Sequence, residues 1–198
     1  MIDLKIPDHV RVQWVISHEM APVPDVNRAI EEALHRPIGS FRLRDIVNPG
    51  QKVALIVTDI TRQLPEETII PLLLKELEQG GIQRQEITAV VATGTHRPNT
   101  KKELKEKFGE VVNEITFINH DAYDEKALIH LGKTAGGIPL VFNRTVAEAD
   151  IRISTGVIET HLFAGYSGGV KSIAVGVAGE ETIAATHNYQ MLQQTRLG

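Results

Sequence analysis

The chain has 198 residues, of which 42% are apolar, and its formal net charge is −4. This length suffices for one sizeable core or two small ones. The mildly acidic balance argues against a nucleic-acid-binding protein, which would show a clustered basic excess. No apolar run is long enough to span a bilayer, and the first residues lack the pattern of a signal peptide. We therefore expect a cytoplasmic protein with neither nucleic acid nor membrane as partner.

The sequence contains no cysteine and eight histidines. The lack of cysteine excludes disulfides and any protein thiolate as nucleophile or metal ligand. A bound metal would have to use imidazole, carboxylate or a sulfur supplied by another molecule. Histidine is also the usual acid–base group near neutral pH, so these side chains are the first candidates for chemistry.

The first 40 residues are expected to form a small appended unit. The stretches L-K-I-P and V-R-V-Q-W-V-I alternate polar and apolar residues and predict a β-hairpin, with Trp14 covering its edge. A-P-V-P-D interrupts this pattern, and Asp25 is placed to cap a helix over about 26–35.

Buried-type strands alternate with helices over the rest of the chain. Helices are expected at about 66–79, at 100–108 and again after Lys171, and strands at 52–59, 87–93, 115–120, 138–143 and 150–156. Continuous β-branched runs such as K-V-A-L-I-V-T-D are typical of parallel strands covered on both faces. We predict an α/β fold with a largely parallel sheet flanked by helices in a Rossmann-like, three-layer arrangement. The final helical pattern stops soon after it begins, which suggests a piece of a longer protein.

Four polar clusters follow predicted strands: D-I-T-R (59–62), G-T-H-R-P (94–98), I-N-H-D (118–121) and G-V-I-E-T-H (156–161). Taken singly, each has an ordinary structural interpretation, such as a helix cap at Asp59 or a turn at His96. Parallel strands, however, end at one edge of a sheet, where ligands bind in open α/β folds. Convergence at that edge favours a binding site.

The stretch G-Y-S-G-G-V-K-S (165–172) looks like a phosphate-binding loop. A Walker A loop requires glycine where Val170 stands, and valine strongly disfavours the positive φ needed there. We therefore reject an ATPase or GTPase. A flexible turn with a solvated lysine and a loop that holds a single phosphate through backbone N–H groups both remain open.

Together, D-I-T-R, G-T-H-R-P, E-T-H-L-F-A-G-Y-S-G-G-V-K-S and A-T-H-N, in this order from about residue 40 to the end, resemble the lactate racemase family. Members of that family use a nickel-pincer nucleotide and are about twice as long. The resemblance implies that 1–198 is the N-terminal cofactor-binding domain, that the C-terminal domain closing over the site lies outside it, and that this part alone has little or no turnover. Expected partners are a 2-hydroxy acid, the C-terminal domain and cofactor-synthesis proteins.

The resemblance also implies roles for residues at matching positions. Lys171 would be the covalent attachment point of the cofactor, and His187 would ligate nickel. His96 and His161 would be the two acid–base groups, and Arg62 would hold the substrate carboxylate. The remaining residues expected against the cofactor are Asp59, Thr61, Gly168, Gly169 and Ser172.

Two other functions stay open from the residues alone. The first is a mononucleotide- or phosphate-binding module without redox chemistry. The second is a zinc hydrolase using His96, His161 and His187, because three imidazoles with one open position suit zinc. His120 and Asp121 are ambiguous between a cleft and a structural position. His9, His18 and His35 are expected at the surface, and His130 is expected to be half-buried.

Overall fold

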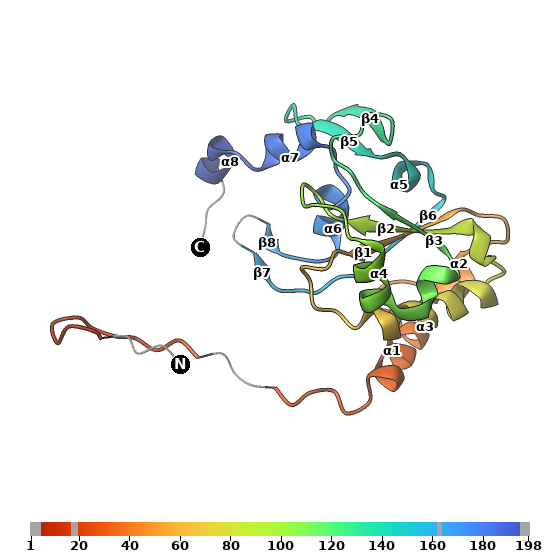
Figure 1. The fold of residues 1–198 in the computed structure, drawn as a ribbon, viewed down its shortest axis with the longest axis horizontal. Helices are drawn as coiled ribbons and strands as arrows, with labels where there is room; N and C mark the ends of the chain where they lie inside the picture. The colour runs from red at the N-terminus through yellow and green to blue at the C-terminus, as the bar shows by residue number, and fades with distance from the viewer. Residues whose placement is uncertain (1–4, 17–19, 162–163, 195–198) are drawn as a thin grey trace.

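The computed structural model describes residues 5–16, 20–161 and 164–194. Its centre is a sheet of four strands in the order β3-β2-β1-β6 (Figure 1). These strands are β1 (Val53–Thr58), β2 (Ile87–Ala92), β3 (Thr116–Asn119) and β6 (Ile151–Ser154). Every pairing among them is parallel, so the predicted α/β fold is confirmed.

Helices cover both faces of the sheet. One face carries α3 (Glu66–Gln79), α4 (Lys101–Phe108) and the 3-10 helix η2 (Gly109–Asn113). The other face carries α5 (Arg144–Glu148) and α6 (Val170–Ala174). Because it is covered on both sides, β1 is buried along its whole length, as its continuous apolar run predicts.

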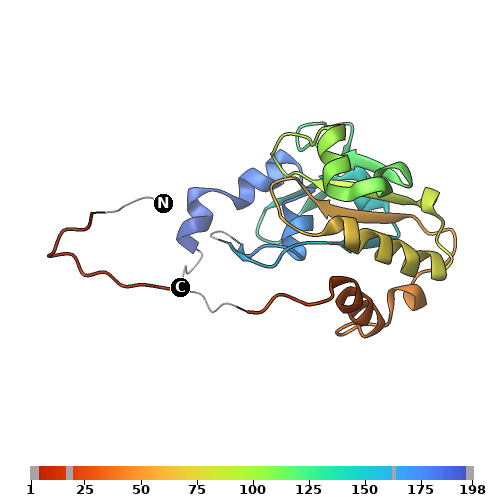
Figure 2. The ribbon, with the colours of Figure 1, turned by 60° about the horizontal axis from the view of Figure 1, so that its bottom comes forward.

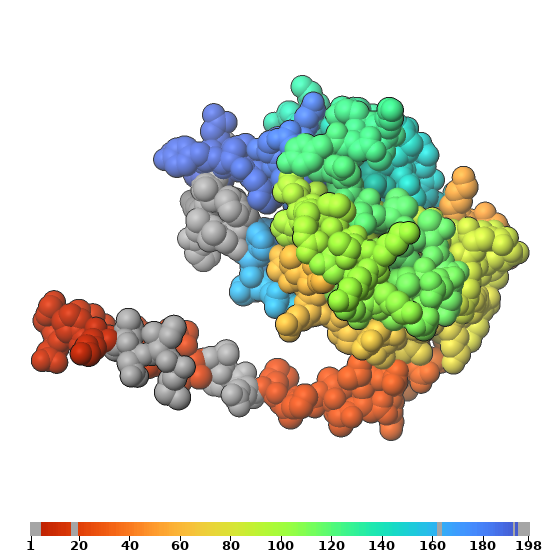
Figure 3. Space-filling view, in the orientation of Figure 1, coloured from red at the N-terminus to blue at the C-terminus, as the bar shows by residue number. Residues whose placement is uncertain are grey.

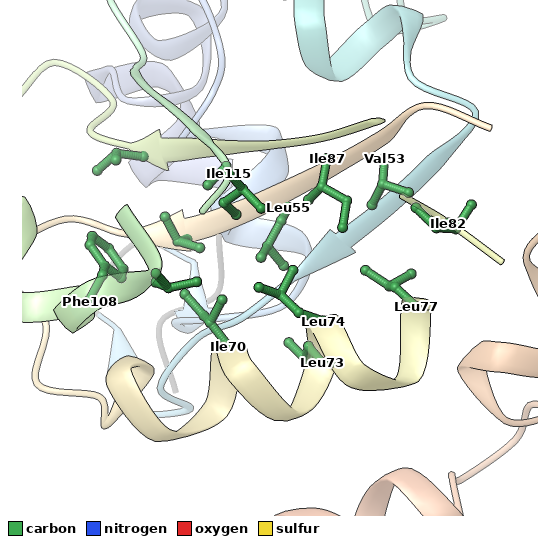
Figure 4. Packing of buried hydrophobic residues seen from close by; sticks show 14 of the residues in the cluster. Val53, Leu55, Ile70, Leu73, Leu74, Leu77, Ile82, Ile87, Phe108 and Ile115 are labelled. Carbon is green, nitrogen blue, oxygen red and sulfur yellow. The ribbon is translucent and has the colours of Figure 1, made fainter. Parts of the chain in front are cut away.

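The larger core lies between α3 and the sheet. Ile70, Leu74 and Leu77 project from one side of α3 onto Leu55 and Ile87 of the strands (Figure 4). Each of these five side chains is at most 1% exposed. Burying such a side chain stabilises the fold by about 1.5–3 kcal/mol. This packing fixes the strand ends from which the site loops leave.

The remaining elements surround this core. They are α1 (Val26–His35), α2 (Leu43–Ile46), η1 (Arg84–Glu86), α7 (Glu180–Thr186) and α8 (Tyr189–Gln194). Two antiparallel ribbons, β4 (Leu128–Lys133) with β5 (Pro139–Asn143) and β7 (Thr160–His161) with β8 (Gly165–Tyr166), lie outside the main sheet. The α7–α8 segment projects from the body of the molecule (Figure 3). No helix in the described ranges is long and apolar enough to cross a membrane.

The predicted N-terminal hairpin is wrong. Residues 5–16 contain no strand and extend from the body as an arm (Figure 2). Trp14, expected to cover an edge, is 81% exposed. A two-stranded hairpin is marginal without a surface to pack on, so alternation alone does not form one here. The helical part of the prediction is confirmed: Asp25 caps α1 by accepting a hydrogen bond from the Arg28 amide at 3.0 Å.

Candidate active site

A cavity of about 270 Å³ lies at the carboxyl end of the sheet. Its walls come from the loops after β1 and β2, from the segment after β6 and from the glycine-rich loop that enters α6. Most of the predicted site residues line it: Asp59, Arg62, His96, His161, Gly168, Lys171, Ser172 and His187. Segments more than 100 residues apart in the chain are therefore gathered around one space.

Thr61 and Gly169 do not line the cavity. Thr61 instead donates two hydrogen bonds to Asp59 Oδ1, from its amide at 3.1 Å and from its hydroxyl at 2.6 Å. Gly169 has a φ of +48° and is the N-cap of α6. Both residues shape the loops that carry lining residues.

Asp59 orients His96. The Asp59 side chain is 5% exposed, and its Oδ2 lies 2.6 Å from His96 Nδ1. A carboxylate accepts hydrogen bonds, so Nδ1 carries the proton and the lone pair of a neutral His96 ring is on Nε2. This arrangement leaves Nε2 as the ring nitrogen that can accept a proton.

His161 is held in the other tautomer. The amide of Ala164 donates to His161 Nδ1 at 3.2 Å, so in the neutral ring the proton lies on Nε2. Burial lowers the pKa of His161, and the positive charges of Lys171 and Arg62 lower it further. The neutral form is therefore favoured near pH 7, and the two cavity histidines differ in which ring nitrogen holds the proton.

Two cations, Lys171 and Arg62, line the cavity. Burial lowers the pKa of the Lys171 ammonium, with a further contribution from Arg62 that Asp59 partly offsets. A larger fraction of Lys171 is consequently a neutral, nucleophilic amine than in an exposed lysine. The Arg62 side chain is 37% exposed, and its nearest acidic partner, Glu159, lies at 3.9 Å, which is too long for a hydrogen bond.

His187 follows α7 as its C-cap residue. Its Nδ1 lies 3.2 Å from the Ile183 carbonyl oxygen and 3.0 Å from the Thr186 hydroxyl. A carbonyl only accepts, so Nδ1 is the protonated nitrogen and Nε2 holds the lone pair. Metal-binding histidines commonly donate their second N–H to a backbone carbonyl in this way.

The glycine-rich loop lies very close to the segment after β6. Gly168 has a φ of +71°, and a Cβ placed there would meet the Val157 carbonyl oxygen at 2.9 Å. A Cβ on Gly156 would likewise meet the Gly168 Cα at 2.9 Å. Both positions therefore require glycine. They leave bare backbone in the cavity wall beside Lys171.

Comparison with known proteins places this arrangement in a family. A family model described as the lactate racemase N-terminal domain matches residues 1–198. The chain belongs to the lactate racemase N-terminal domain family. It is 37% identical over 168 residues to a lactate racemase of Lactiplantibacillus plantarum, covering 84% of this chain and 39% of that protein.

A second lactate racemase, from Thermoanaerobacterium thermosaccharolyticum, is 37% identical over 159 residues, which are 80% of this chain and 37% of that protein. The solved structure of a lactate racemase apoprotein from the same organism has a TM-score of 0.74 and 37% identity, covering 79% of this chain and 38% of that one. A crystal structure of a Thermotoga maritima protein, 24% identical with a TM-score of 0.69 and covering 85% of this chain and 42% of that one, shares the fold. The chain thus spans about two fifths of the length of the curated relatives that it matches.

Within this member of the lactate racemase N-terminal domain family, two residues of the strand-end clusters turn away from the cavity. His120 is 2% exposed; its Nε2 donates to the Ala178 carbonyl oxygen at 2.8 Å, so its position is structural. Arg97 forms a two-pronged pair with Glu103 of α4 at 2.6 and 2.8 Å. That pair lowers the pKa of Glu103 to about 2.

The other histidines are placed as follows. His9 and His35 are exposed as expected, whereas His130 is exposed rather than half-buried and pairs with Glu125 at 3.2 Å. His18 lies outside the described residues.

Across the described part of the chain, no group of three or more His, Asp or Glu residues is arranged to hold a metal ion, so the three-histidine zinc site is not formed.

Sequence reasoning missed Ser167 as a residue of the site. It lines the cavity, is 7% exposed, and its hydroxyl donates to the Val157 carbonyl oxygen at 2.6 Å. The same hydroxyl accepts from the Glu159 amide at 3.0 Å, which fixes the glycine-rich loop to the segment after β6. Its place directly before two glycines is the one signal that could have indicated it.

Proposed function

We propose that this chain is the N-terminal catalytic domain of an isomerase that racemises or epimerises a 2-hydroxy acid with a nickel-pincer nucleotide. One observation carries the proposal: Arg62, His96, His161, Lys171 and His187, from separate segments, line one cavity. These are a carboxylate-binding cation, two acid–base groups, a nucleophilic amine and a metal-binding imidazole. Family membership supports the same reaction class.

The residues present fit the cofactor in three respects. The Lys171 amine is partly buried and has a lowered pKa, which favours covalent attachment. His187 holds its lone pair on Nε2, the form that binds metals. Gly156 and Gly168 let the glycine-rich loop pack directly against the segment after β6, which fixes the backbone beside Lys171 against which a phosphate-bearing group would lie. A single protein imidazole suffices because a sulfur-bearing cofactor would provide the other nickel ligands.

The protein's own residues account for binding and proton transfer. When bound, the nickel-pincer nucleotide supplies an acceptor for the hydride from C2 of the acid. Arg62 binds the carboxylate through two parallel N–H groups, which fixes the substrate. His96 Nε2 takes the hydroxyl proton, and Asp59 stabilises the resulting imidazolium. His161, on β7, is the second acid–base group; its Nδ1 accepts from the Ala164 amide, so it takes up a proton only once that hydrogen bond is released.

Turnover is expected to need more than these residues. The relatives continue well beyond the matched region. We infer that the remaining part closes the site and contributes to the choice of 2-hydroxy acid, and that cofactor-synthesis proteins load the nucleotide. Purified without those proteins, the present chain is expected to lack the cofactor and to show little or no activity.

Intact-protein mass spectrometry tests the proposal. The protein is produced together with the cofactor-synthesis enzymes, and added mass located at Lys171 by peptide mapping is expected, with none in Lys171→Ala. Lys133→Ala is a matched control because this lysine lies in the exposed part of β4. Racemisation of lactate by loaded enzyme without any adduct at Lys171 would refute the proposed attachment. Tight binding of AMP without nickel would favour the phosphate-binding alternative.

A further inference from the structure

A buried carboxylate joins the ends of two central strands. Glu66, the first residue of α3, is 0% exposed. Its Oε1 accepts from the Thr58 amide at 2.9 Å and from the Thr155 hydroxyl at 2.7 Å, and its Oε2 accepts from the Thr58 hydroxyl at 2.8 Å. Thr58 ends β1 and lines the cavity, and Thr155 follows β6. One side chain therefore connects two of the segments from which the site is built.

Lys107 extends this connection to the loop that carries Arg62. Its ammonium Nζ lies 3.1 Å from Glu66 Oε2 and donates to the Arg62 carbonyl oxygen at 2.7 Å. The Lys107 side chain is 9% exposed. It belongs to α4, which the fork between Arg97 and Glu103 ties to the loop carrying His96.

Stability alone explains this pair poorly. Removing two charges from water costs about as much as their attraction returns, and apolar residues of similar volume often serve a fold equally well. Positioning explains it better. Within the described ranges the Arg62 guanidinium is paired only loosely, with Glu159 at 3.9 Å, so its direction depends on how its backbone is held. Lys107 holds the carbonyl of that same residue.

We propose that Glu66 and Lys107 form a positioning pair that fixes the Arg62 loop against the ends of β1 and β6, and thereby fixes the cation that recognises the substrate carboxylate. The identity of that substrate rests on the proposed function. The hydrogen bond by which Lys107 holds the Arg62 loop is independent of the proposed function.

The main test uses the double variant Glu66→Gln/Lys107→Met. Lys107→Met alone would leave a buried carboxylate without its cation, whereas the double variant removes both charges and keeps an oxygen acceptor for Thr58 and Thr155. The matched control is Lys105→Met/Glu110→Gln, which removes an exposed pair, 61% and 74% exposed, from the same region. Both variants are expected to keep thermal midpoints near that of the unmodified chain.

Amide hydrogen exchange is the first measurement. Amides of residues 60–63 are expected to exchange about tenfold faster in the Glu66/Lys107 variant, since a hydrogen bond from a charged donor is lost. Amides of β1 and the entire control variant are expected to be unchanged. Unchanged exchange at 60–63 would overturn the coupling.

Steady-state kinetics with lactate is the second measurement, made on cofactor-loaded enzyme that also contains the remaining part found in the relatives. KM is expected to rise about tenfold with kcat nearly constant, because a misplaced carboxylate anchor weakens binding before and during the reaction alike. A KM equal to that of the control, in enzyme that does racemise lactate, overturns the positioning role even where exchange is faster. Faster exchange in an enzyme inactive on lactate before any substitution would instead exclude lactate as the 2-hydroxy acid and leave the coupling intact.

Discussion

Asp59 and His96 form a short hydrogen bond of 2.6 Å across the cavity wall, between the loop after β1 and the loop after β2. The same carboxylate accepts two hydrogen bonds from Thr61, so its orientation is fixed from its own loop. His96 is 56% exposed along its side chain and is oriented chiefly through this contact. The dyad joins the loops after two parallel strands and fixes which ring nitrogen of His96 carries the proton.

The first prediction concerns this dyad. Asp59→Asn keeps the shape of the side chain but no longer fixes the proton on Nδ1 or stabilises the imidazolium. In cofactor-loaded enzyme that also contains the remaining part found in the relatives, we expect kcat for racemisation to fall about 10²-fold or more, the size of a general-base contribution, with a small change in KM. The control is Asp121→Asn, because Asp121 is exposed and accepts from the Tyr123 amide away from the cavity. Equal activity of the two variants would remove Asp59 from the mechanism.

The second prediction concerns His161. Burial, then Lys171 and Arg62, lower its pKa below the ordinary value of 6.5. Arg62→Gln removes one cation, so the pKa is expected to rise while staying below 6.5 because burial, the largest cause, remains. Titration of the His161 ring by NMR measures this. Arg97→Gln is the control, since Arg97 is paired with Glu103. A pKa in the unmodified protein at or above 6.5 would contradict the prediction.

The third prediction concerns the buried His120. Burial lowers its pKa in the folded state, although the Ala178 hydrogen bond and Asp121 partly offset this. Above pH 6.5 both folded and unfolded states hold neutral His120, and no stability is lost. As the pH falls below 6.5 the unfolded state takes up the proton first, so the free energy of unfolding decreases until the folded-state pKa is reached. The loss amounts to about 1.4 kcal/mol for each pH unit by which the two pKa values differ.

Urea unfolding at pH 7.5, 6.5 and 5.5 measures this loss. His120→Gln removes the titration and keeps an N–H donor, so its stability should decrease less between pH 6.5 and 5.5 than that of the unmodified chain. His130→Gln, at a surface position 56% exposed, should leave the pH dependence unchanged. The same pH slope in all three proteins would show that His120 does not carry the effect.

The central strands and the place of the site could be predicted because both depend on strong local signals. The run V-A-L-I-V-T is apolar on both faces and fits only a covered parallel strand. Parallel strands end at one edge, so the clusters at Asp59 and His96 had to approach each other. The buried His120 carries no such signal, because a polar residue after a strand is equally common in a cavity and beneath a neighbouring segment.

Other features depend on distant partners that spacing does not reveal. β4 was not predicted, since L-I-H-L-G-K has an exposed outer half and pairs only with β5. The helix K-K-E-L-K-E-K-F reads as a solvated charged helix, yet Lys107 is buried against Glu66, 41 positions earlier in the chain. The N-terminal arm shows the opposite error, because residues 5–16 alternate clearly and yet are exposed throughout.

The last prediction separates two reasons for glycine in the loop before Lys171. Gly165 and Gly168 have nearly equal φ values of +73° and +71°. A Cβ on Gly165 meets no atom of the described residues within 4 Å, whereas a Cβ on Gly168 meets the Val157 carbonyl oxygen at 2.9 Å. Each alanine variant bears the cost of a left-handed conformation, about 1–2 kcal/mol. Only Gly168→Ala must also move the loop away from the segment after β6.

We therefore expect a larger loss of thermal stability in Gly168→Ala, together with loss of the mass adduct at Lys171, while Gly165→Ala keeps the adduct. Equal stability and equal adduct yield in the two variants would show that close approach of the two backbones does not shape the site.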